Sequence, residues 1–435
     1  MAIQLKSTAS NSRIDVRATA LVFLAVLATM LTLHPGAHAQ TYTVLHTFTG
    51  GADGRSPLDG LSMDRAGNLY GTTSVGGDIQ GGCAEFSGCG VVFKMKQTGS
   101  SWLLLPLYAF TGSPDGRYPV GRVVLGPDGA LYGTTVYGGQ ASQDQEEGCG
   151  ILYRLSPPPT SPHSAIFSWS ETILYTPTGE GGDGCGLTDF GGLTFDASGD
   201  LYGTASGGGA SDVGTVFELT HSGDQWTQST IHSFVRGYDG AYPAAGATLD
   251  QSGNLFGTTE LFPGSVYQLS PSQSGWTVSV LRFFNGQDGG TEPVGGVIFD
   301  SSGNLYGTTV GGGTGYGGVV FQLAPSGGSW TFNLLYSFIG EAGPSSDLLL
   351  DSAGNLYGTT YKDGRFGVGN VFKLSPSGDG WTYTSLYDFH GTGDGGFPQS
   401  NLIMDAAGNL YGTTTLGGNL NDCPSGCGVV FEITP

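Results

Sequence analysis

Six acidic residues recur at one point of a repeated pattern, and their side chains are the best placed to do chemistry. Five belong to an Asp-Gly pair followed by Pro, and the sixth Asp-Gly pair lacks the Pro. The residues are Asp53, Asp115, Asp183, Asp239, Asp288 and Asp394. Gathered on one surface, their carboxylates would form a negative mouth that attracts a hard cation such as Ca²⁺ or a polyhydroxylated ligand. The alternative is that Asp-Gly bends the chain and Pro starts the next strand.

Aromatic residues near these positions, Tyr137 and Tyr316, could stack on sugar rings or serve as packing contacts. Enzyme signatures are sparse. No Gly-x-Ser-x-Gly occurs, and Gly313–Gly318 matches a dinucleotide motif only by its letters, because it joins two predicted strands and opens no helix. We therefore expect a binding or interaction scaffold without a cofactor. A polysaccharide hydrolase or lyase that uses two mouth carboxylates is one alternative, and a structural envelope protein is another.

A repeat of four predicted strands must position these residues. Its most constant stretch is Asn-Leu-Tyr-Gly-Thr-Thr at 304–309. Related copies begin at Asn68, Ala130, Asp200, Asn254, Asn304, Asn355 and Asn409. In the fifth copy we expect strand A at 296–300, strand B at 305–309, strand C at 319–323 and strand D at 330–338. A small sheet with two apolar faces must stack on copies of itself, so the sequence predicts an all-β, seven-bladed β-propeller of four antiparallel strands per blade.

The turn between strands A and B carries a Gly in all seven copies, which predicts a residue at positive φ. An Asp stands three residues before that Gly in six copies, where its carboxylate can accept hydrogen bonds from the turn amides. In a propeller the loops between D and A lie on the same face as the loops between B and C. The predicted mouth therefore lies on that face.

Trp marks six D strands, whereas there are seven sets of strands A to C, and the chain ends in a strand C at 428–435. Residues 42–48 align with the strand D at 383–389, so we expect the N-terminal strand to complete the last blade. This closure removes free sheet edges. The predicted blades are 57–110, 119–177, 186–234, 243–284, 293–338, 344–389, and 398–435 with 41–48, in one domain spanning 40–435.

The first 39 residues read as a signal peptide, with Lys6, Arg13 and Arg17 before an apolar run at 18–33 and small residues at Ala37 and Ala39. Cleavage near Ala39–Gln40 would take the formal charge from −21 to −23. Such acidity disfavours nucleic acid and anionic membrane surfaces as partners. We expect a monomer that is secreted, periplasmic or on the cell surface, with no membrane span in the mature chain.

All six cysteines follow the predicted signal peptide, and an even number in an exported protein favours disulfides. We expect the pairs Cys83–Cys89, Cys149–Cys185 and Cys423–Cys427. Zinc binding is the alternative, although no histidine cluster accompanies these cysteines.

The repeat unit resembles the GloVer (Gloeo/Verruco) tandem repeat of bacterial exported proteins in the "choice-of-anchor" group. The matching pattern is Asp-x-x-Gly-Asn-Leu-Tyr-Gly-Thr-Thr, followed by Gly-Gly and a Gly-x-Val-Phe strand. The resemblance implies a secreted or surface repeat protein with no assigned activity. Members often carry a C-terminal anchor, but this sequence ends at Pro435 directly after strand C, so we expect a free exported protein. The strands are more loosely similar to those of NHL propellers, which supports the fold only.

Overall fold

The computed structural model describes residues 40–140, 147–159, 168–179, 182–187, 192–223, 225–261, 263–286, 289–340, 343–378 and 380–434. Residues 42–434 form one compact unit. The predicted signal peptide lies outside the described residues and stays a prediction. Apart from one 3-10 helix, η1 (Gly81–Phe86), the described elements are β-strands. None of the helices in the described ranges is long and apolar enough to cross a membrane.

The first three blades follow the predicted strand order. Blade 1 contains β2 (Ser62–Met63), β3 (Leu69–Thr73), β4 (Val91–Thr98) and β5 (Ser101–Ala109). Blade 2 contains β6 (Arg117–Leu125), β7 (Leu131–Tyr137), β8 (Ile151–Ser156) and β9 (Ser170–Tyr175). Blade 3 contains β11 (Thr194–Phe195), β12 (Leu201–Gly207), β13 (Thr215–Ser222) and β14 (Gln225–Ser233), and the additional strand β10 (Cys185–Leu187) also pairs with β12.

The remaining blades repeat this order, and the last is assembled from both ends of the chain. Blade 4 contains β15 (Thr248–Leu249), β16 (Leu255–Thr259), β17 (Ser265–Ser272) and β18 (Gly275–Phe283). Blade 5 contains β19 (Ile298–Phe299), β20 (Leu305–Thr309), β21 (Tyr316–Ser326) and β22 (Ser329–Ile339). Blade 6 contains β23 (Leu349–Leu350), β24 (Leu356–Thr360), β25 (Asn370–Ser377) and β26 (Gly380–Asp388). Blade 7 contains β27 (Ile403–Met404), β28 (Leu410–Thr414), β29 (Val429–Thr434) and β1 (Thr41–Thr47).

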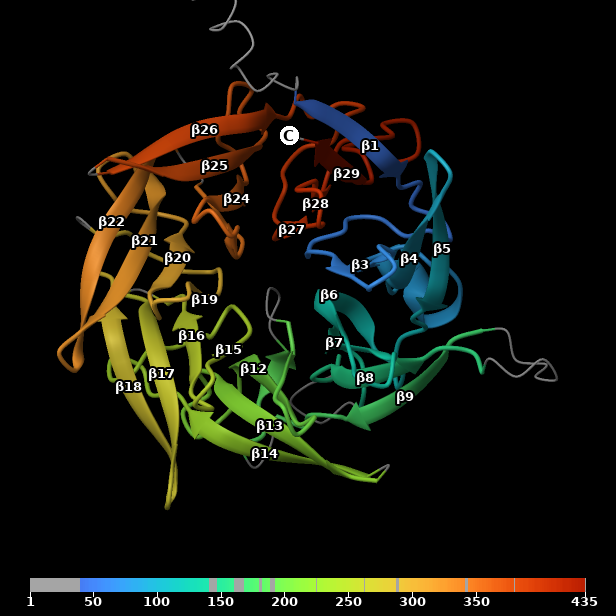
Figure 1. The fold of residues 1–435 in the computed structure, drawn as a ribbon. Coiled ribbons are helices and arrows are strands. Elements are labelled where there is room, and N and C mark those ends of the chain that lie inside the picture. The colour runs from blue at the N-terminus through green and yellow to red at the C-terminus, as the bar shows by residue number, and fades with distance from the viewer. Residues whose placement is uncertain are drawn as a thin grey trace, which may run out of the picture. The chain divides into compact units, whose positions relative to one another are not determined.

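The seven-bladed propeller and its closure by the N-terminal strand are therefore confirmed. Figure 1 shows the short first strands, such as β19 and β27, toward the centre of the ring, and the long fourth strands, such as β22 and β5, at its rim. Strand β1 pairs with β29 and takes the place of the missing fourth strand. The described part of the chain thus completes each four-stranded sheet of the ring.

The Gly in the repeated Leu-Tyr-Gly-Thr-Thr stretch makes room for an aromatic ring on the neighbouring strand. Gly307 in β20 pairs directly with Phe321 in β21. A Cβ on Gly307 would lie 2.6 Å from Cζ of Phe321, which is fully buried. The turn Gly has a different reason: Gly303 has open space around it but a φ of 82°, as the turn requires.

In blades 3 to 7 the first Thr of the same stretch forms a hydrogen bond to the following blade. Thr308 Oγ1 donates a hydrogen bond to the carbonyl of Ser346 in blade 6 at 3.1 Å. The equivalent Thr204, Thr258 and Thr359 make the same bond to the following blade. Thr413 closes the ring by donating to the carbonyl of Asp59 in blade 1 at 3.1 Å. These bonds hold the inner strand segments, whose carbonyls accept them.

Aromatic packing seals the outer part of the blade interfaces. The Tyr of strand B contacts the Trp of strand D in the following blade, as for Tyr306 and Trp381, whose ring centroids are 6.3 Å apart. The hydroxyl of Tyr306 also donates to Asp300 Oδ2 at 3.0 Å. Asp300 accepts the turn amides of Ser302 and Asn304 as well, which is the role expected for the turn Asp.

Three disulfides are present, and they join the same pairs that the sequence suggests. Cys83–Cys89 and Cys423–Cys427 each close a short segment of one B–C loop. Cys149–Cys185 instead links the B–C loop of blade 2 to β10 of blade 3. In the described ranges no cysteine is free.

Gly307→Ala tests the close approach of strand B to the buried ring of Phe321. The added methyl forces that ring from its position, so we expect a loss of about 1–3 kcal/mol in the free energy of unfolding, measured by chemical denaturation. Gly380→Ala is the matched control, because its Cβ meets nothing within 4 Å and its φ is not positive. Equal stability of the two variants would contradict this explanation.

Candidate functional site

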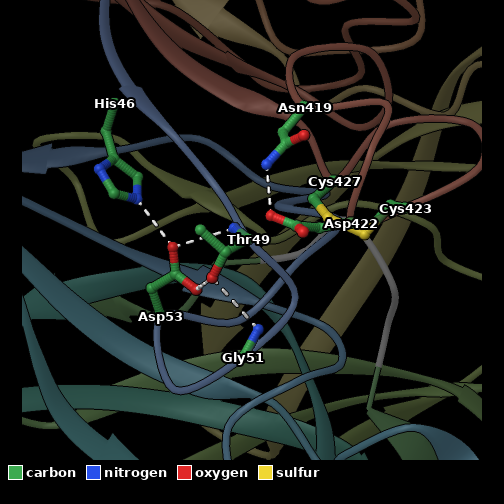
Figure 2. A network of polar contacts seen from close by, with 8 residues as sticks. All are labelled: His46, Thr49, Gly51, Asp53, Asn419, Asp422, Cys423 and Cys427. Carbon is green, nitrogen blue, oxygen red and sulfur yellow. Dashed lines mark hydrogen bonds and ion pairs between the residues drawn. A yellow bond between two sulfur atoms is a disulfide. The ribbon is translucent and has the colours of Figure 1, made fainter.

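The predicted mouth carboxylates hydrogen-bond within their own D–A loops. Figure 2 shows Asp53, whose Oδ2 lies 3.0 Å from His46 Nε2 and accepts the amide of Thr49 at 3.0 Å. The Thr49 hydroxyl donates to Oδ1 of the same carboxylate at 2.5 Å. The neighbouring Gly50 approaches the Cys423–Cys427 disulfide, so this loop packs against the B–C loop of blade 7.

The same arrangement recurs around the ring. In all five described loops a Tyr or His of strand D contacts the carboxylate, and the backbone amide four or five residues before the Asp donates to it. The strand D contacts are Tyr108–Asp115 at 3.0 Å, Tyr175–Asp183 at 2.9 Å, His232–Asp239 at 2.8 Å and Tyr387–Asp394 at 3.0 Å. Burial raises the pKa of Asp394, but the hydrogen bonds from His390 and Tyr387 outweigh it and hold that pKa below its ordinary value. These carboxylates therefore have a structural use in each loop.

Asp288, the sixth predicted carboxylate, lies outside the described residues. Among the residues that the structure describes, no group of three or more His, Cys, Asp or Glu side chains is placed to hold a metal ion. The Ca²⁺ site at the mouth consequently stays a prediction.

The two predicted aromatic residues differ in their surroundings. Tyr137 packs over the guanidinium of Arg117, whose Cζ lies 4.8 Å from the ring centroid, and Arg117 also covers Phe86. Tyr316 is 82% exposed and pairs across β21 and β22 with Ile339, which is equally exposed. Bridges such as Arg55 with Val75 and Thr291 with Gly311 join D–A loops to B–C loops, so these loops share one face.

A pair of carboxylates, one buried and one partly buried, lies beside this face between blades 1 and 2. Tyr108 donates to Asp115, and Glu171 of β9 lies close enough for the two carboxylates to interact electrostatically. Burial and the charge of Asp115 together raise the pKa of Glu171 to about 7, although a hydrogen bond with Tyr108 opposes the shift. Burial also raises the pKa of Asp115. The position of Glu171 recurs two residues after the strand D Trp, but none of the other Trp-marked blades has an acidic residue there, so sequence reasoning missed it.

The central channel contains a second set of polar side chains, at the beginning of each strand A segment. These side chains occupy the position four residues before the turn Asp. In blade 2, where Gly126 replaces that Asp, the position is four residues before Gly126. Its occupants, in blade order, are Gly60, Arg122, Gly192, Gly246, Gly296, Asp347 and Asn401. Four glycines thus leave space for three long polar side chains. A Cβ on Gly60, for example, would lie 1.3 Å from Asn401 Oδ1.

These side chains meet in a narrow part of the channel, which we call the constriction and define by Asp59, Arg122, Ser345, Asp347 and Asn401. Asp347 accepts the amide of Gly296 at 2.6 Å, and Asp59 accepts the amide of Gly121. Ser345 Oγ and Asn401 Oδ1 are buried and have no hydrogen-bond partner in the described part of the chain. Ser345 is only 8% exposed. Two buried polar atoms are therefore available to a ligand.

The constriction surrounds a cavity of about 60 Å³, and residues from all seven blades line it. This volume accommodates a group of a few heavy atoms or a few waters. Burial raises the pKa of Asp347, while the amide of Gly296 and the charge of Arg122 oppose the shift. The constriction thus combines a guanidinium donor, two carboxyl groups and two side chains that can both donate and accept hydrogen bonds.

Sequence reasoning placed function in the loops and missed the constriction. A signal was nonetheless present, because Arg122, Asp347 and Asn401 interrupt an otherwise constant Gly position of the repeat. Only the closed ring shows that these three positions face one another across a channel.

The fold and channel define a repeat-built β-propeller, and comparison with known families gives the particular repeat. The Gloeobacter/Verrucomicrobia repeat family matches residues 29–193 and 260–435, more than half of the chain. The chain therefore belongs to this family, as the sequence resemblance indicates. The unmatched stretch contains β11 to β16, which nevertheless follow the blade order. No curated protein sequence matches the chain.

Several solved structures are similar to this chain at low sequence identity. The extracellular domain of a protein assigned as a hybrid two-component system from B. thetaiotaomicron has a TM-score of 0.51 at 12% identity, covering 90% of this chain and 39% of that one. A protein assigned as a gluconolactonase has a TM-score of 0.40 at 15% identity, covering 93% and 94%. A luciferin-regenerating enzyme has a TM-score of 0.43 at 12% identity, covering 91% and 96%. At these identities the likeness concerns the fold alone.

Glu171→Gln tests the electrostatic interaction between Glu171 and Asp115. Because the pKa of Glu171 is raised from 4.5 to about 7, the folded protein keeps a proton that the unfolded chain releases, and stability falls as the pH rises through that window. The neutral Gln avoids this loss. We expect the variant to be more stable than the wild type by about 1–2 kcal/mol near pH 8, with allowance for the partial exposure of Glu171. Urea denaturation near pH 4 should show no gain, and an equal gain at both pH values would contradict the interpretation.

Proposed function

We propose that the protein is an exported binding protein that holds a small polar ligand at the channel constriction. The observation that carries the proposal is the pair of buried, unpartnered atoms, Ser345 Oγ and Asn401 Oδ1, beside a cavity lined by all seven blades. Leaving buried polar atoms without partners costs about 1–3 kcal/mol each, and a bound ligand recovers that energy. Mixed donors and acceptors in a concave site are typical of small-molecule recognition.

The chemistry of the constriction favours a hydroxylated ligand, such as the end of a glycan. Arg122 only donates hydrogen bonds, ionised carboxylates only accept them, and Ser345 and Asn401 do both. A hydroxyl group both donates and accepts hydrogen bonds, so it can pair with each of these side chains. Arg122 places a positive charge where a bare cation would bind, which disfavours a cation as the main ligand. The formal charge of −21 disfavours nucleic acid.

The loop face is the second candidate, and Tyr316 and Ile339 support it. Their side chains are each 82% exposed and face one another across β21 and β22. Exposed apolar residues of this kind suit contact with a protein or the face of a sugar ring. The loop carboxylates contribute less to this proposal, because their own loops already use them.

Asn401→Leu tests the constriction directly, since it keeps the size of the side chain and removes the unpartnered oxygen. We expect binding of a hydroxylated ligand found on a glycan array to weaken at least about 10-fold in calorimetric titration, which corresponds to about 1.4 kcal/mol. Asn333→Leu on the outer strand β22 is the matched control and should bind normally.

Unchanged affinity in Asn401→Leu would remove the constriction from the binding site. If the triple variant Asp115→Asn, Asp239→Asn and Asp394→Asn then lost binding, the loop face would replace it. Release of sugar products during the same titrations would favour the hydrolase or lyase alternative.

Export is the other part of the proposal, and the apolar run at 18–33 together with three disulfides supports it. We expect protein recovered from the culture medium or periplasm to begin at Gln40 when its N-terminus is sequenced. Recovery from the cytoplasm with Met1 intact would contradict export with cleavage.

A further inference from the structure

Beyond the constriction, toward the A–B turns, the channel wall changes from polar to apolar. We call the residue two positions before the turn Asp, or before Gly126 in blade 2, the wall position. Four blades place aliphatic side chains there, namely Val124, Ile298, Leu349 and Ile403. Phe299 and Met404 line the same part of the channel. We call these six residues the collar.

The other three blades have Ser62, Thr194 and Thr248 at the wall position, but their hydroxyls are already used. Each donates a hydrogen bond to a carbonyl of the next blade, at 2.5, 2.7 and 2.6 Å respectively. Their remaining hydrogen-bonding capacity is therefore reduced, and the wall offers few polar groups to a ligand.

The fold does not require aliphatic residues at the wall position. The preceding residue of each strand A fills the space between blades, as Val297, Leu348 and Leu402 do with exposures of 1%, 4% and 3%. The collar residues are only half-buried. The collar residues pack at the edges of the blade cores, and the parts of them left exposed line the channel. Three blades have Ser or Thr at the wall position, so the ring accepts a polar residue there.

The cavities at the collar and at the constriction share lining residues. The collar surrounds a cavity of about 770 Å³, and Arg122, Asp347 and Asn401 line both this cavity and the smaller one at the constriction. Small-molecule sites typically measure about 300–1,000 Å³ and combine apolar walls with a few polar groups. A ligand that reaches the constriction from this side must lie against the collar.

We propose that the ligand is a hydroxylated amphiphile, with its polar head at the constriction and its apolar body along the collar. The inference rests on the proposed function and adds the class of ligand and its direction of entry, from the side of the A–B turns. Glycosides that carry an alkyl chain have this chemistry. Burying apolar surface against the collar adds affinity that the head alone lacks.

Matched pairs of glycosides test the inference. Methyl and octyl forms of β-glucoside, β-galactoside and β-maltoside are titrated into the whole protein by calorimetry, below the critical micelle concentrations. For at least one head group we expect the octyl form to bind about 50-fold or more tightly than the methyl form, as burial of three or more methylenes predicts. A hydroxyl-free octyl amine oxide should bind no more tightly than the methyl form.

The collar is tested by replacing Ile298, Leu349 and Ile403 together with Thr, which the ring already accepts at this position in Thr194 and Thr248. We expect this variant to lose most of the octyl advantage and to bind the methyl glycoside as the wild type does. The control carries Leu103→Thr, Leu105→Thr and Leu334→Thr, three exposed residues of the outer strands. Thermal unfolding of both variants verifies that they are folded.

The outcomes separate the two proposals. If the octyl and methyl forms bind with equal affinity and Asn401→Leu abolishes the binding of both, the constriction remains the binding site. The proposal that the ligand is an amphiphile is then overturned. Tight binding of the amine oxide would show that the hydroxylated head group is not needed, and would overturn its proposed binding at the constriction. If no glycoside of either length binds, both proposals fail. A folded collar variant with the full octyl advantage would also overturn the inference.

Discussion

The contact between a Gly of strand B and an aromatic ring of strand C is the interaction on which the other features of each blade depend. At Gly307 the absent side chain lets Phe321 lie flat across its own sheet, so that the ring is fully buried. The blade is then thin enough at its centre for the next blade to approach closely. That approach brings the Thr308 hydroxyl within reach of a carbonyl in the following blade. Packing and hydrogen bonding thus support one another at the interfaces where this bond forms.

The hydrogen bonds from the Thr hydroxyls also make the channel backbone independent of the side chains that line the channel. Because Thr hydroxyls hold the inner carbonyls, the backbone around the channel is fixed regardless of the side chains that project into it. Those side chains are free to vary, and they do: Gly occupies four of seven positions, whereas Arg122, Asp347 and Asn401 occupy the others. Variation on a rigid frame is where binding specificity usually resides. Here it lies within the ring as well as in its loops.

Most of the fold could be predicted from the sequence, because each structural role recurs. The turn Gly, the six Trp residues and the aligned strand at 42–48 predict the number of blades and the closure. The cysteines occupy loops close enough to suggest their pairing. The constriction was not predictable in this way, because Arg122, Asp347 and Asn401 differ in type and lie in separate blades, and only the closed ring brings their shared repeat position together. Residues recur in every repeat when each blade needs them to pack on the next, so the most regular residues indicate the fold and not the binding site. The recurring Asp53 and Asp394 illustrate this, because their carboxylates bind their own loops.

Blade 7 has a consequence for the order in which the protein folds. Its sheet combines β1, at the start of the folded unit, with β27 to β29 at its end. Blades 1 to 6 are continuous in sequence and can form as the chain emerges, each on the one before. The last blade has to wait until the C-terminal strands are available, and contacts between residues so far apart are slow to form. Until then β1 and the open sides of blades 1 and 6 stay unpaired, so the nearly complete ring is the state most exposed to wrong association.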